Sequence, residues 1–493
     1  MQSFVKESWY EILVTTIYII NFLAIINLIF REKRSIEATV AWVLVLTTAP
    51  AVGCILYIAV GRDISKNNMF KIKEAEDKIL KENIIDTQIK LDSNDNFEPD
   101  LIGYKDMIYA LANSNSSHFT TNNDVEIFPE SNDFFESLLE ELKKAKHHIN
   151  IQFYIFKDDE IGNKIIDILI DKAQNGVEVR LLYDAVGSRL FSDKSINKLK
   201  KSGVKVGVFF PSFLKIINFN LNYRNHRKIV VVDGKVGFIG GNNIGDEYLG
   251  KDPKFGYWRD THLKITGNSV KDLNIRFILD WRYTTKEDLN LDKYFGSETL
   301  RLSNSKACKD IGIQIVSSGP DSTELDEIKY GYIKMIQKAK KYIYIQTPYF
   351  ILDKTLTDTL KIACFSGVDV RIMIPSKPDH PFVYWASSSY AGELIKYGAK
   401  LYNYDHNAFL HAKTIVVDDC VCSIGTANMD IRSFELNFEI NAFMYSSQVA
   451  KKQRAIFEND ILRSKEITLD MYNSRSRYMR IKESISRLLS PIL

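Results

Sequence analysis

The stretch HRKIVVVD at residues 226–233 occurs a second time, as HAKTIVVD, at residues 411–418. Both copies fit the pattern H-x-K-x4-D, and in both an asparagine, Asn243 or Asn428, follows 17 residues after the histidine. All these positions of the second copy are displaced by the same 185 residues. One match to so short a pattern can arise by chance, but two matches in register indicate a duplicated unit.

The spacing within each copy predicts a strand that carries two reactive side chains. Because side chains alternate across a strand, the histidine and the lysine of H-x-K are expected on the same face. The apolar runs at residues 229–232 and 415–417 predict buried strands. Glycine-containing turns after these strands would bring each asparagine back to the same mouth.

The duplication extends upstream of both motifs. Residues 145–152 are similar to 339–346, residues 175–180 to 366–371, and residues 202–205 to 397–400. Each half predicts alternating helices and strands with glycine turns between them. We therefore expect an α/β fold with helices on both faces of a sheet, and two such halves packed as a pseudo-symmetric pair.

The composition of the 493-residue chain is that of a globular protein, with 45% hydrophobic and 26% charged residues. It excludes a disordered tail protein, a collagen-like fibre and a small disulfide scaffold. A net charge of +3 gives no argument for nucleic acid as a partner. The five cysteines are scattered without a C-x-x-C pair, which favours reduced thiols facing the cytosol.

Two uncharged segments near the N-terminus predict a transmembrane helical hairpin. Residues 12–30 and 38–60 are runs of 19 and 23 residues without a charge. A helix of either length can cross a hydrocarbon layer of about 30 Å. Two core helices of a soluble protein, or a cleaved signal peptide, explain the pair less well.

The charges that flank the spans predict the orientation of the hairpin. Basic residues outside the two spans outnumber those in the link between them by six to three, and cytoplasmic segments carry the excess of positive charge. We expect a multi-pass protein of the inner (plasma) membrane with cytoplasmic catalytic domains. The basic residues counted are Lys6, Arg62, Lys66, Lys71, Lys73 and Lys78 outside the spans, and Arg31, Lys33 and Arg34 in the link.

Two histidines and two lysines at matched positions suit phosphoryl-transfer chemistry. The lysines supply fixed positive charge for a transition state that gathers negative charge on the non-bridging oxygens. One imidazole can attack phosphorus and form a covalent intermediate. The other can protonate the departing alkoxide and then deprotonate the incoming hydroxyl. No metal-ligand set accompanies the motifs, so we expect neither a metal nor another cofactor.

The doubled motif resembles that of the phospholipase D superfamily, and other stretches resemble the bacterial cardiolipin synthases with two N-terminal membrane spans. Those stretches are YIFKDDEIG at 154–162, LYDAVGS at 182–188, GNNIGDEY at 241–248, YWRDTH at 257–262 and QTPYF at 346–350. The resemblance implies two phospholipase D-type α/β/α domains. It also implies a phosphatidyltransferase that joins two phosphatidylglycerol molecules into cardiolipin and releases glycerol, through a phosphatidyl-histidine intermediate.

The resemblance also implies roles for individual residues. His226 and His411 would be the nucleophile and the acid/base; the family favours His226 as nucleophile, although the symmetry of the sequence leaves this open. The acids that orient the histidines are expected on later strands, at Asp260, 34 residues after His226, and at Glu439, 28 residues after His411. The groups expected to bind phosphate are Lys228, Lys413, Asn243 and Asn428.

Four further residues of the motifs have less certain roles by this reasoning. Asp233 and Asp418 complete the motifs and are counted with the catalytic set, but their place at a strand end favours a structural role. Gly241 and Thr426 stand where many relatives carry serine, which is expected to alter one phosphate contact without disabling the site.

These observations together predict four segments. We expect a transmembrane hairpin at residues 1–62, a juxtamembrane helix and linker at 63–115, and phospholipase D-like domains at 116–295 and 296–493. Apolar residues at 208–214, 216–217 and 381–385 either line a lipid entry or belong to the core. The C-terminal helix, with apolar residues interspersed among arginines, either lies on anionic lipid or packs on the second domain.

Other functions remain open at this stage. The expected partners are phosphatidylglycerol and the lipid bilayer, without nucleic acid. A membrane-bound phospholipase D that transfers the phosphatidyl group to water is the nearest alternative, because acceptor choice depends on excluding water from the site. A nucleic-acid phosphodiesterase is disfavoured by the near-neutral charge, and a non-catalytic scaffold by the intact doubled motif.

Overall fold

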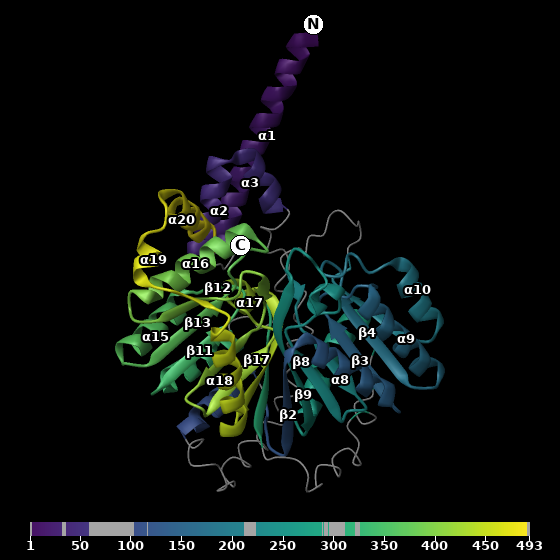
Figure 1. Ribbon diagram of the computed structural model, residues 1–493. Coiled ribbons are helices and arrows are strands. Elements are labelled where there is room, and N and C mark those ends of the chain that lie inside the picture. The colour runs from purple at the N-terminus through teal and green to yellow at the C-terminus, as the bar shows by residue number, and fades with distance from the viewer. Residues whose placement is uncertain are drawn as a thin grey trace.

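Two mixed β-sheets lie side by side in the centre of the molecule (Figure 1). The structure is a computed structural model that describes residues 2–31, 36–58, 103–115, 117–211, 223–287, 289, 294, 311–320 and 326–490. Residues 63–102 of the predicted juxtamembrane helix and linker (63–115) and residues 212–217 of the apolar stretch lie outside the described residues.

Each sheet belongs mainly to one half of the chain. In spatial order the first sheet consists of β15 (Ala408–Leu410), β9 (Tyr257–Gly267), β8 (Val236–Gly240), β7 (Ile229–Val232), β3 (His148–Phe153), β4 (Glu178–Asp184) and β5 (Lys205–Phe209), and β2 (Asn123–Glu130) pairs with β9. The second consists of β1 (Phe119–Thr120), β10 (Gly312–Ser318), β19 (Asn437–Tyr445), β17 (Val421–Gly425), β16 (Thr414–Val417), β11 (Tyr342–Gln346), β13 (Asp369–Ile374), β14 (Lys400–Asn403) and β20 (Lys465–Ile467), and β6 (Arg224–Asn225) pairs with β19.

The halves repeat the same strand order, which confirms the predicted duplication. In the first half β7 lies antiparallel between β3 and β8, with Ile229 opposite Gln152. In the second half β16 lies antiparallel between β11 and β17, with Thr414 opposite Gln346. All four residues of β7 and of β16 are buried, as the apolar runs predict for strands that are covered on both faces.

Helices cover the outer faces of both sheets and fill the space between them (Figure 1). The outer helices of the first half are α8 (Ser131–Lys144), α9 (Glu160–Gln174) and α10 (Asp193–Lys201), and those of the second are α14 (Glu327–Lys338), α15 (Lys354–Phe365) and α16 (Pro381–Ile395). The central core packs α11 (Val270–Thr285) and α18 (Ser447–Ile461) against strands of both sheets. The architecture is therefore the predicted pair of α/β layers.

The halves exchange short strands, which the sequence did not predict. β15 of the second half adds to the first sheet beside β9, and β6 of the first half adds to the second sheet beside β19. β1 and the helix α7 (Lys105–Asn115) also pack on the second half, β1 through β10 and α7 through α14. The boundary expected at residue 116 therefore does not coincide with a boundary between the sheets.

The tripeptides His226–Lys228 and His411–Lys413 connect the two sheets. β6 ends in the second sheet at Asn225, and β7 begins in the first sheet at Ile229. β15 and β16 show the converse arrangement around His411. The prediction that each H-x-K lies in a regular strand is therefore wrong, because residues 226–228 and 411–413 lie in the extended crossing between the two sheets.

The N-terminal segment forms one long apolar helix and two shorter ones. α1 (Gln2–Phe30) includes a 22-residue stretch from Trp9 to Phe30 that is long and apolar enough to cross a membrane. The predicted second span is not one helix, since it divides at Pro50 into α2 (Ile36–Thr48) and α3 (Pro50–Leu56). Proline lacks an N–H group and cannot continue the hydrogen-bond ladder back to the fourth preceding carbonyl.

A buried asparagine in α1 compensates for this break. Asn21 Nδ2 donates to the carbonyl of Leu46, the group that Pro50 leaves without its helical donor, and to the carbonyl of Pro50, both at 3.0 Å. Leu28, Trp42, Leu46 and Tyr57 form a buried apolar cluster between the same helices. In an apolar environment an unsatisfied carbonyl is costly, so Asn21 fixes the pairing of α1 with α2 and α3.

We predict that Asn21→Leu weakens the hairpin, because it removes the donor to Leu46. Thermal unfolding in detergent should show a loss of about 1 kcal/mol, while Thr16→Val, on an exposed position of α1, should leave the unfolding temperature unchanged. Equal unfolding temperatures for Asn21→Leu and the unmodified chain would contradict the role given to Asn21.

Candidate active site

Each motif histidine is hydrogen-bonded to an acid from the opposite half of the chain. His226 Nδ1 lies 3.0 and 2.9 Å from the two carboxylate oxygens of Glu439. His411 Nδ1 lies 2.6 Å from Asp260 Oδ2. The sequence identified both acids, but its spacings relate each acid to the histidine of its own half, and the structure pairs them crosswise.

The crossing follows from the exchanged strands. The backbone N–H of His226 donates to the carbonyl of Phe438 at 2.9 Å, next to Glu439 on β19. The backbone N–H of His411 donates to the carbonyl of Arg259 at 2.7 Å, next to Asp260 on β9. Each histidine therefore stands at the edge of the other half's sheet, beside that sheet's acid.

Both imidazoles converge on one region of the interface. A carboxylate at Nδ1 holds the proton on that nitrogen and leaves the lone pair on Nε2. The charge of Lys413 acts on His226, and that of Lys228 acts on His411. The predicted meeting of the two half-sites is therefore present within one chain.

The register of the strands explains why the two acids have unequal spacing in the sequence. Gly240 pairs with His262 on β9, and Gly425 pairs with Asn441 on β19. Asp260 and Glu439 each stand two residues before that partner, on the same face of equivalent strands. The connection from β8 to β9 is longer than that from β17 to β19. It therefore lengthens the sequence distance from histidine to acid in the first half but leaves the register of the strands unchanged.

The carboxylate of Glu439 is held by several donors besides His226. Thr426 Oγ1 donates to Oε2 at 2.6 Å, and Ser433 Oγ and Asn437 Nδ2 donate to Oε1 at 3.1 and 3.2 Å. The position equivalent to Thr426 in the first half is Gly241. A Cβ atom there would lie 1.9 Å from Asp260 Oδ1. Thr426 and Gly241, which stand where many relatives carry serine, thus have different roles. Thr426 donates a hydrogen bond to Glu439, and Gly241 leaves space for Asp260.

Burial and mutual charge shift the titration of the site. Burial lowers the pKa of His411 to about 4, with Lys413 adding to the effect against Asp260, and burial also lowers the pKa of His226. Burial lowers the pKa of Lys228 to about 7 and that of Lys413 to about 8. The site therefore holds neutral imidazoles beside lysines whose charge depends on the pH near neutrality.

The acids remain ionised in spite of their burial. Burial by itself would raise the pKa of Asp260 and of Glu439, but the facing histidine and lysine lower each below its usual range. Each lysine also donates to the carbonyl of the histidine in its own motif, Lys228 to His226 at 2.7 Å and Lys413 to His411. These bonds bring each ammonium group back beside its histidine.

The two asparagines differ in their contacts. Asn243 Oδ1 accepts from the backbone N–H of Ile155 at 3.1 Å, and its Nδ2 donates to the hydroxyl of Tyr248 at 3.0 Å. The buried Oδ1 of Asn428 has no hydrogen-bond partner among the described residues. Asn243 thus also holds the loop after β3, while the amide of Asn428 is less constrained.

Asp233 and Asp418 have structural contacts. Asp233 accepts from the backbone N–H groups of residues 146, 147 and 148 at 2.9, 2.7 and 3.0 Å. Asp418 accepts from those of residues 340, 341 and 342 at 2.6, 2.9 and 2.7 Å. Both acids fix the start of the neighbouring strand, at the end of β7 or β16 remote from the histidine, which supports the structural role over the catalytic one.

Two aromatic rings beside the histidines were not identified from the sequence. The ring centroid of Tyr154 lies 5.1 Å from that of His226, and the ring of Trp258 lies 5.1 Å from that of His411. Both belong to stretches that resemble the family, but neither has a counterpart in the repeat that would single it out. In the described part of the chain, no group of three or more His, Cys, Asp or Glu side chains could hold a metal ion.

The two apolar stretches before the motifs differ in their burial. Phe209 and Phe210 are buried and pack against Phe438, so this part of residues 208–217 belongs to the core. Residues 212–217 lie outside the described residues. In the other stretch, at the start of α16, Phe382 is exposed.

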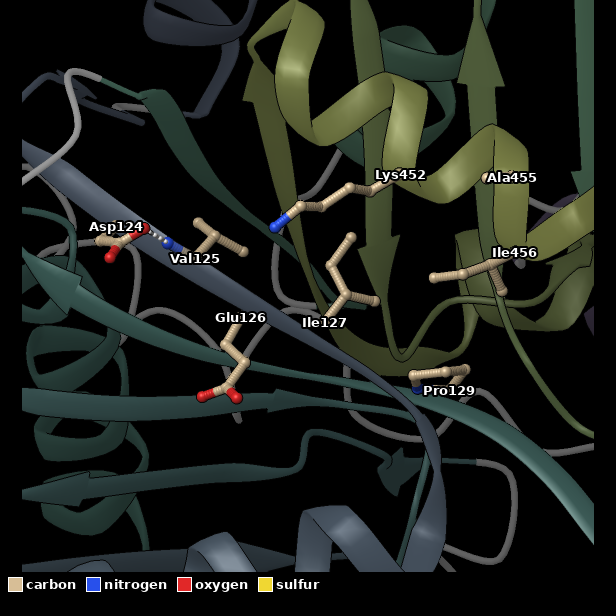
Figure 2. A pocket seen from close by; sticks show the side chains of 8 residues that line it. All are labelled: Asp124, Val125, Glu126, Ile127, Pro129, Lys452, Ala455 and Ile456. Atoms are coloured by element: carbon tan, nitrogen blue, oxygen red, sulfur yellow. Dashed lines mark hydrogen bonds between the residues drawn. The ribbon is translucent and has the colours of Figure 1, made fainter.

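A groove between β2 and α18 is separate from this site. Figure 2 shows Lys452 and Ile456 of α18 facing Val125 and Ile127 of β2 across it. It contains no histidine, and Figure 1 places β2 and α18 toward the end of the globular part that is remote from α1. The full lining is Asp124, Val125, Glu126, Ile127, Pro129, Lys452, Ala455 and Ile456.

Comparison with known proteins identifies the family. Residues 138–253 and 332–461 match the family described as cardiolipin synthase, PLD-like domain, and residues 19–62 match the phospholipase D-nuclease N-terminal family. The chain is 48% identical to the major cardiolipin synthase ClsA of Bacillus subtilis over 98% of its own length and 99% of that protein. The chain belongs to the phospholipase D-like cardiolipin synthase family.

Other members of the family and one solved structure are similar to the chain. A cardiolipin synthase of Oceanobacillus iheyensis is 47% identical over 97% of this chain and 98% of that protein, and one of Staphylococcus aureus is 48% identical over 97% and 95%. The crystal structure of phosphatidylserine synthase from Haemophilus influenzae has a TM-score of 0.59 at 18% identity, covering 78% of this chain and 99% of that one. This likeness supports the two-domain α/β fold.

We predict that Thr426→Val lowers kcat about tenfold, because it removes a charge-assisted hydrogen bond to the acid behind His226. Thr426→Ser, which keeps the hydroxyl, should retain most of the activity. The measurement is turnover of phosphatidylglycerol by both variants at saturating substrate. Equal turnover of the valine and serine variants would contradict the role given to this hydroxyl.

We also predict that Gly241→Ala impairs turnover, because the new Cβ would displace Asp260 from His411. Gly103→Ala is the matched control, since a Cβ at that position meets no atom within 4 Å. Activity should fall in the first variant by about tenfold or more, by analogy with misplaced catalytic groups, and stay unchanged in the second. Unimpaired turnover of Gly241→Ala would show that Asp260 can move without cost.

Proposed function

We propose that the chain is a cardiolipin synthase that transfers a phosphatidyl group from one phosphatidylglycerol to another. The observation that carries the proposal is the crossed pairing of His226 with Glu439 and of His411 with Asp260, which places both motif histidines at the interface between the halves. The cardiolipin synthases to which the chain is 47–48% identical support the choice of substrate.

In the first step one Nε2 atom attacks phosphorus. A nitrogen–phosphorus bond forms while the bond from phosphorus to the oxygen of the glycerol headgroup breaks. His411, which the bound phosphodiester anion stabilises in its imidazolium form, gives the proton on Nε2 to the departing oxygen, so that glycerol leaves and His411 becomes neutral. His226 is the nucleophile in this proposal, because its carboxylate is held by three further donors and so keeps the ring in one orientation.

In the second step the neutral His411 takes the proton from a terminal hydroxyl of a second phosphatidylglycerol. That oxygen attacks phosphorus, the bond to His226 breaks, and cardiolipin forms. A phosphodiester is broken and a phosphodiester is made, so the exchange is close to thermoneutral and reversible. Water would give phosphatidic acid instead, and its exclusion decides between synthase and lipase.

Lys228, Lys413, Asn243 and Asn428 bind the phosphoryl oxygens in this scheme. The two lysines place positive charge on both sides of the transferred group, where the transition state gathers negative charge. Since each half supplies one histidine and the acid for the other, neither domain, residues 116–295 or 296–493, is active alone. The cofactor-free scheme needs only side chains of this chain.

The location of the enzyme is proposed from its N-terminal segment. α1 crosses the membrane, and α2 with α3 returns as a second, broken span that is held to α1 by Asn21. The excess of basic residues outside the spans supports a cytoplasmic position for both domains. The enzyme then meets phosphatidylglycerol in the leaflet to which it is tethered.

We predict that His226→Ala and His411→Ala each abolish cardiolipin formation, with a loss of about 10³-fold or more, as for other paired catalytic groups. The assay supplies phosphatidylglycerol labelled in its headgroup glycerol and separates cardiolipin, phosphatidic acid and glycerol by thin-layer chromatography. In His411→Ala the labile phosphatidyl group should accumulate on His226, visible by mass spectrometry.

Three outcomes would contradict the mechanism. Wild-type cardiolipin output from either variant would remove the two-histidine scheme. A phosphatidyl group trapped on His411 in His226→Ala would reverse the two roles. Phosphatidic acid as the main product of the unmodified enzyme would make it a lipase.

We predict from the two lysines that kcat/KM falls as the pH rises through about 7 to 8, because Lys228 and Lys413 lose their protons in the free enzyme over that range. A bound phosphodiester anion stabilises the ammonium form, so kcat should hold to higher pH. Rates at several substrate concentrations between pH 6 and 9 test this. A kcat/KM that does not change over the range would show that neither lysine titrates there.

A further inference from the structure

The C-terminal helix α20 (Arg477–Leu489) turns its polar face inward and its apolar face outward. Glu483, Ser486 and Ser490 are buried. Its large apolar side chains are exposed: Tyr478 by 67%, Ile481 by 57%, Ile485 by 49% and Leu488 by 52%. A surface helix of a soluble protein has the reverse arrangement, so this helix is shaped for apolar surroundings on its outer side.

Polar contacts fix this orientation. Arg487 Nη2 lies 2.6 Å from Glu393 Oε2 of α16, and Ser490 Oγ lies 3.1 Å from the hydroxyl of Tyr390. Arg475 Nη2 lies 2.9 Å from Glu483 Oε2 on the inner face. α20 packs along α16, so it cannot turn its apolar side inward without breaking these ion pairs. Of the two alternatives expected for this helix, packing on the second domain is observed, and it involves only the polar side of the helix.

The apolar surface extends onto α16. Phe382 in the first turn of α16 is 47% exposed, and its ring lies 5.6 Å from that of Trp385. Lys482 of α20 lies over the rings of both Trp385 and Tyr478, at 4.5 and 4.2 Å. We call Tyr478, Ile481, Ile485, Leu488 and Phe382 the outer apolar surface.

The charge around this surface is positive. Arg477 and Arg480 of α20 are exposed, and Lys482 and Arg487 are partly exposed. The only acid of the helix, Glu483, is buried against Arg475. Exposed apolar side chains flanked by basic ones are the pattern of a helix that lies in the headgroup region of an anionic bilayer.

The position of the helix agrees with that environment. Figure 1 shows α16, the short helix α19 (Leu469–Asn473) and α20 at the end of the globular part from which α1, α2 and α3 project. A membrane entered by α1 would therefore lie on the side where the outer apolar surface is found.

We propose that the outer apolar surface docks on the surface of the phosphatidylglycerol-containing bilayer in which α1 is anchored, and that it holds the active site at headgroup level. α16 packs on β12 (Phe350–Ile351), which pairs with β18 (Met429–Asp430) directly after Asn428. The docked surface is thus linked through three short elements to the phosphate site. The choice of phosphatidylglycerol rests on the proposed function, whereas the docking rests on the helix alone.

Photolabelling of the full chain tests the docking without requiring turnover. The chain is placed in nanodiscs of phosphatidylglycerol and phosphatidylcholine that contain a lipid with a diazirine near the headgroup, and labelled peptides are mapped by mass spectrometry. We expect labelling at residues 478–488 and at Phe382. The peptide around Phe365 is the matched control. Phe365 is 72% exposed, and it ends α15 shortly before β13, whose first residue Asp369 pairs with Tyr342 at the end of β11 remote from Gln346.

Two variants sharpen the result. Ile481→Ser combined with Ile485→Ser should lower labelling of α20 about fivefold and raise KM in the same discs, with kcat in detergent micelles unchanged. Arg477→Gln combined with Arg480→Gln should lower labelling only in discs that contain phosphatidylglycerol. Phe365→Ser should change none of these quantities.

The proposal is overturned if α20 and the Phe365 peptide are labelled equally, or if α20 is unlabelled and cross-links to a second copy of the chain. Failure of the proposed function is a distinct result. Labelling of α20 without cardiolipin formation would leave the docking standing and remove the enzyme assignment, and cardiolipin formation without labelling would do the reverse.

Discussion

The hydrogen bond from each histidine to a carboxylate of the opposite half is the contact on which the active site depends. A carboxylate that is buried without a partner is strongly destabilising, so Glu439 and Asp260 require the groups that face them. Because the histidine and the lysine that face each acid belong to the other half, the interface between the sheets and the catalytic geometry are the same structure. The buried ion pair between Arg259 and Asp460, at 2.8 Å, crosses the interface in the same way. An opening between the halves would have to break the pairing of β6 with β19 and of β15 with β9, so the catalytic geometry and the sheets would be disrupted together.

The two halves repeat the same central strand order but differ in the chemistry of their sites. One half offers a glutamate supported by a threonine hydroxyl, and the other an aspartate packed against a glycine. The longer side chain needs a second donor to hold its carboxylate, while the shorter one reaches its histidine directly and needs space. This asymmetry gives the two imidazoles different surroundings, as a reaction that assigns one to attack and the other to proton transfer requires.

The N-terminal helices and the C-terminal helix α20 lie at the same end of the molecule, and both direct polar groups toward other parts of the protein (Figure 1). Asn21 supplies the hydrogen bond that Pro50 removes from the second apolar segment. α20 uses its polar residues to attach to α16 and leaves its apolar residues outside. In both places polar groups contact protein and large apolar side chains stay exposed, the inverse of the arrangement in the two central sheets.

The sequence by itself determined the duplication, the α/β class, the apolar N-terminus and the identity of both histidines and both lysines, because these depend on periodicity and on matched spacing along the chain. The two acids were expected only from the resemblance to the family, since their distances from the histidines, 34 and 28 residues, do not match. The sequence did not determine which acid is paired with which histidine, that residues 226–228 and 411–413 lie between strands of different sheets, or that the second apolar run divides at Pro50. Only the tertiary structure decided these, since β6 and β15 pair with strands more than a hundred residues away. Strand pairing over such distances in the chain produces no periodic pattern in the sequence near the residues that it positions.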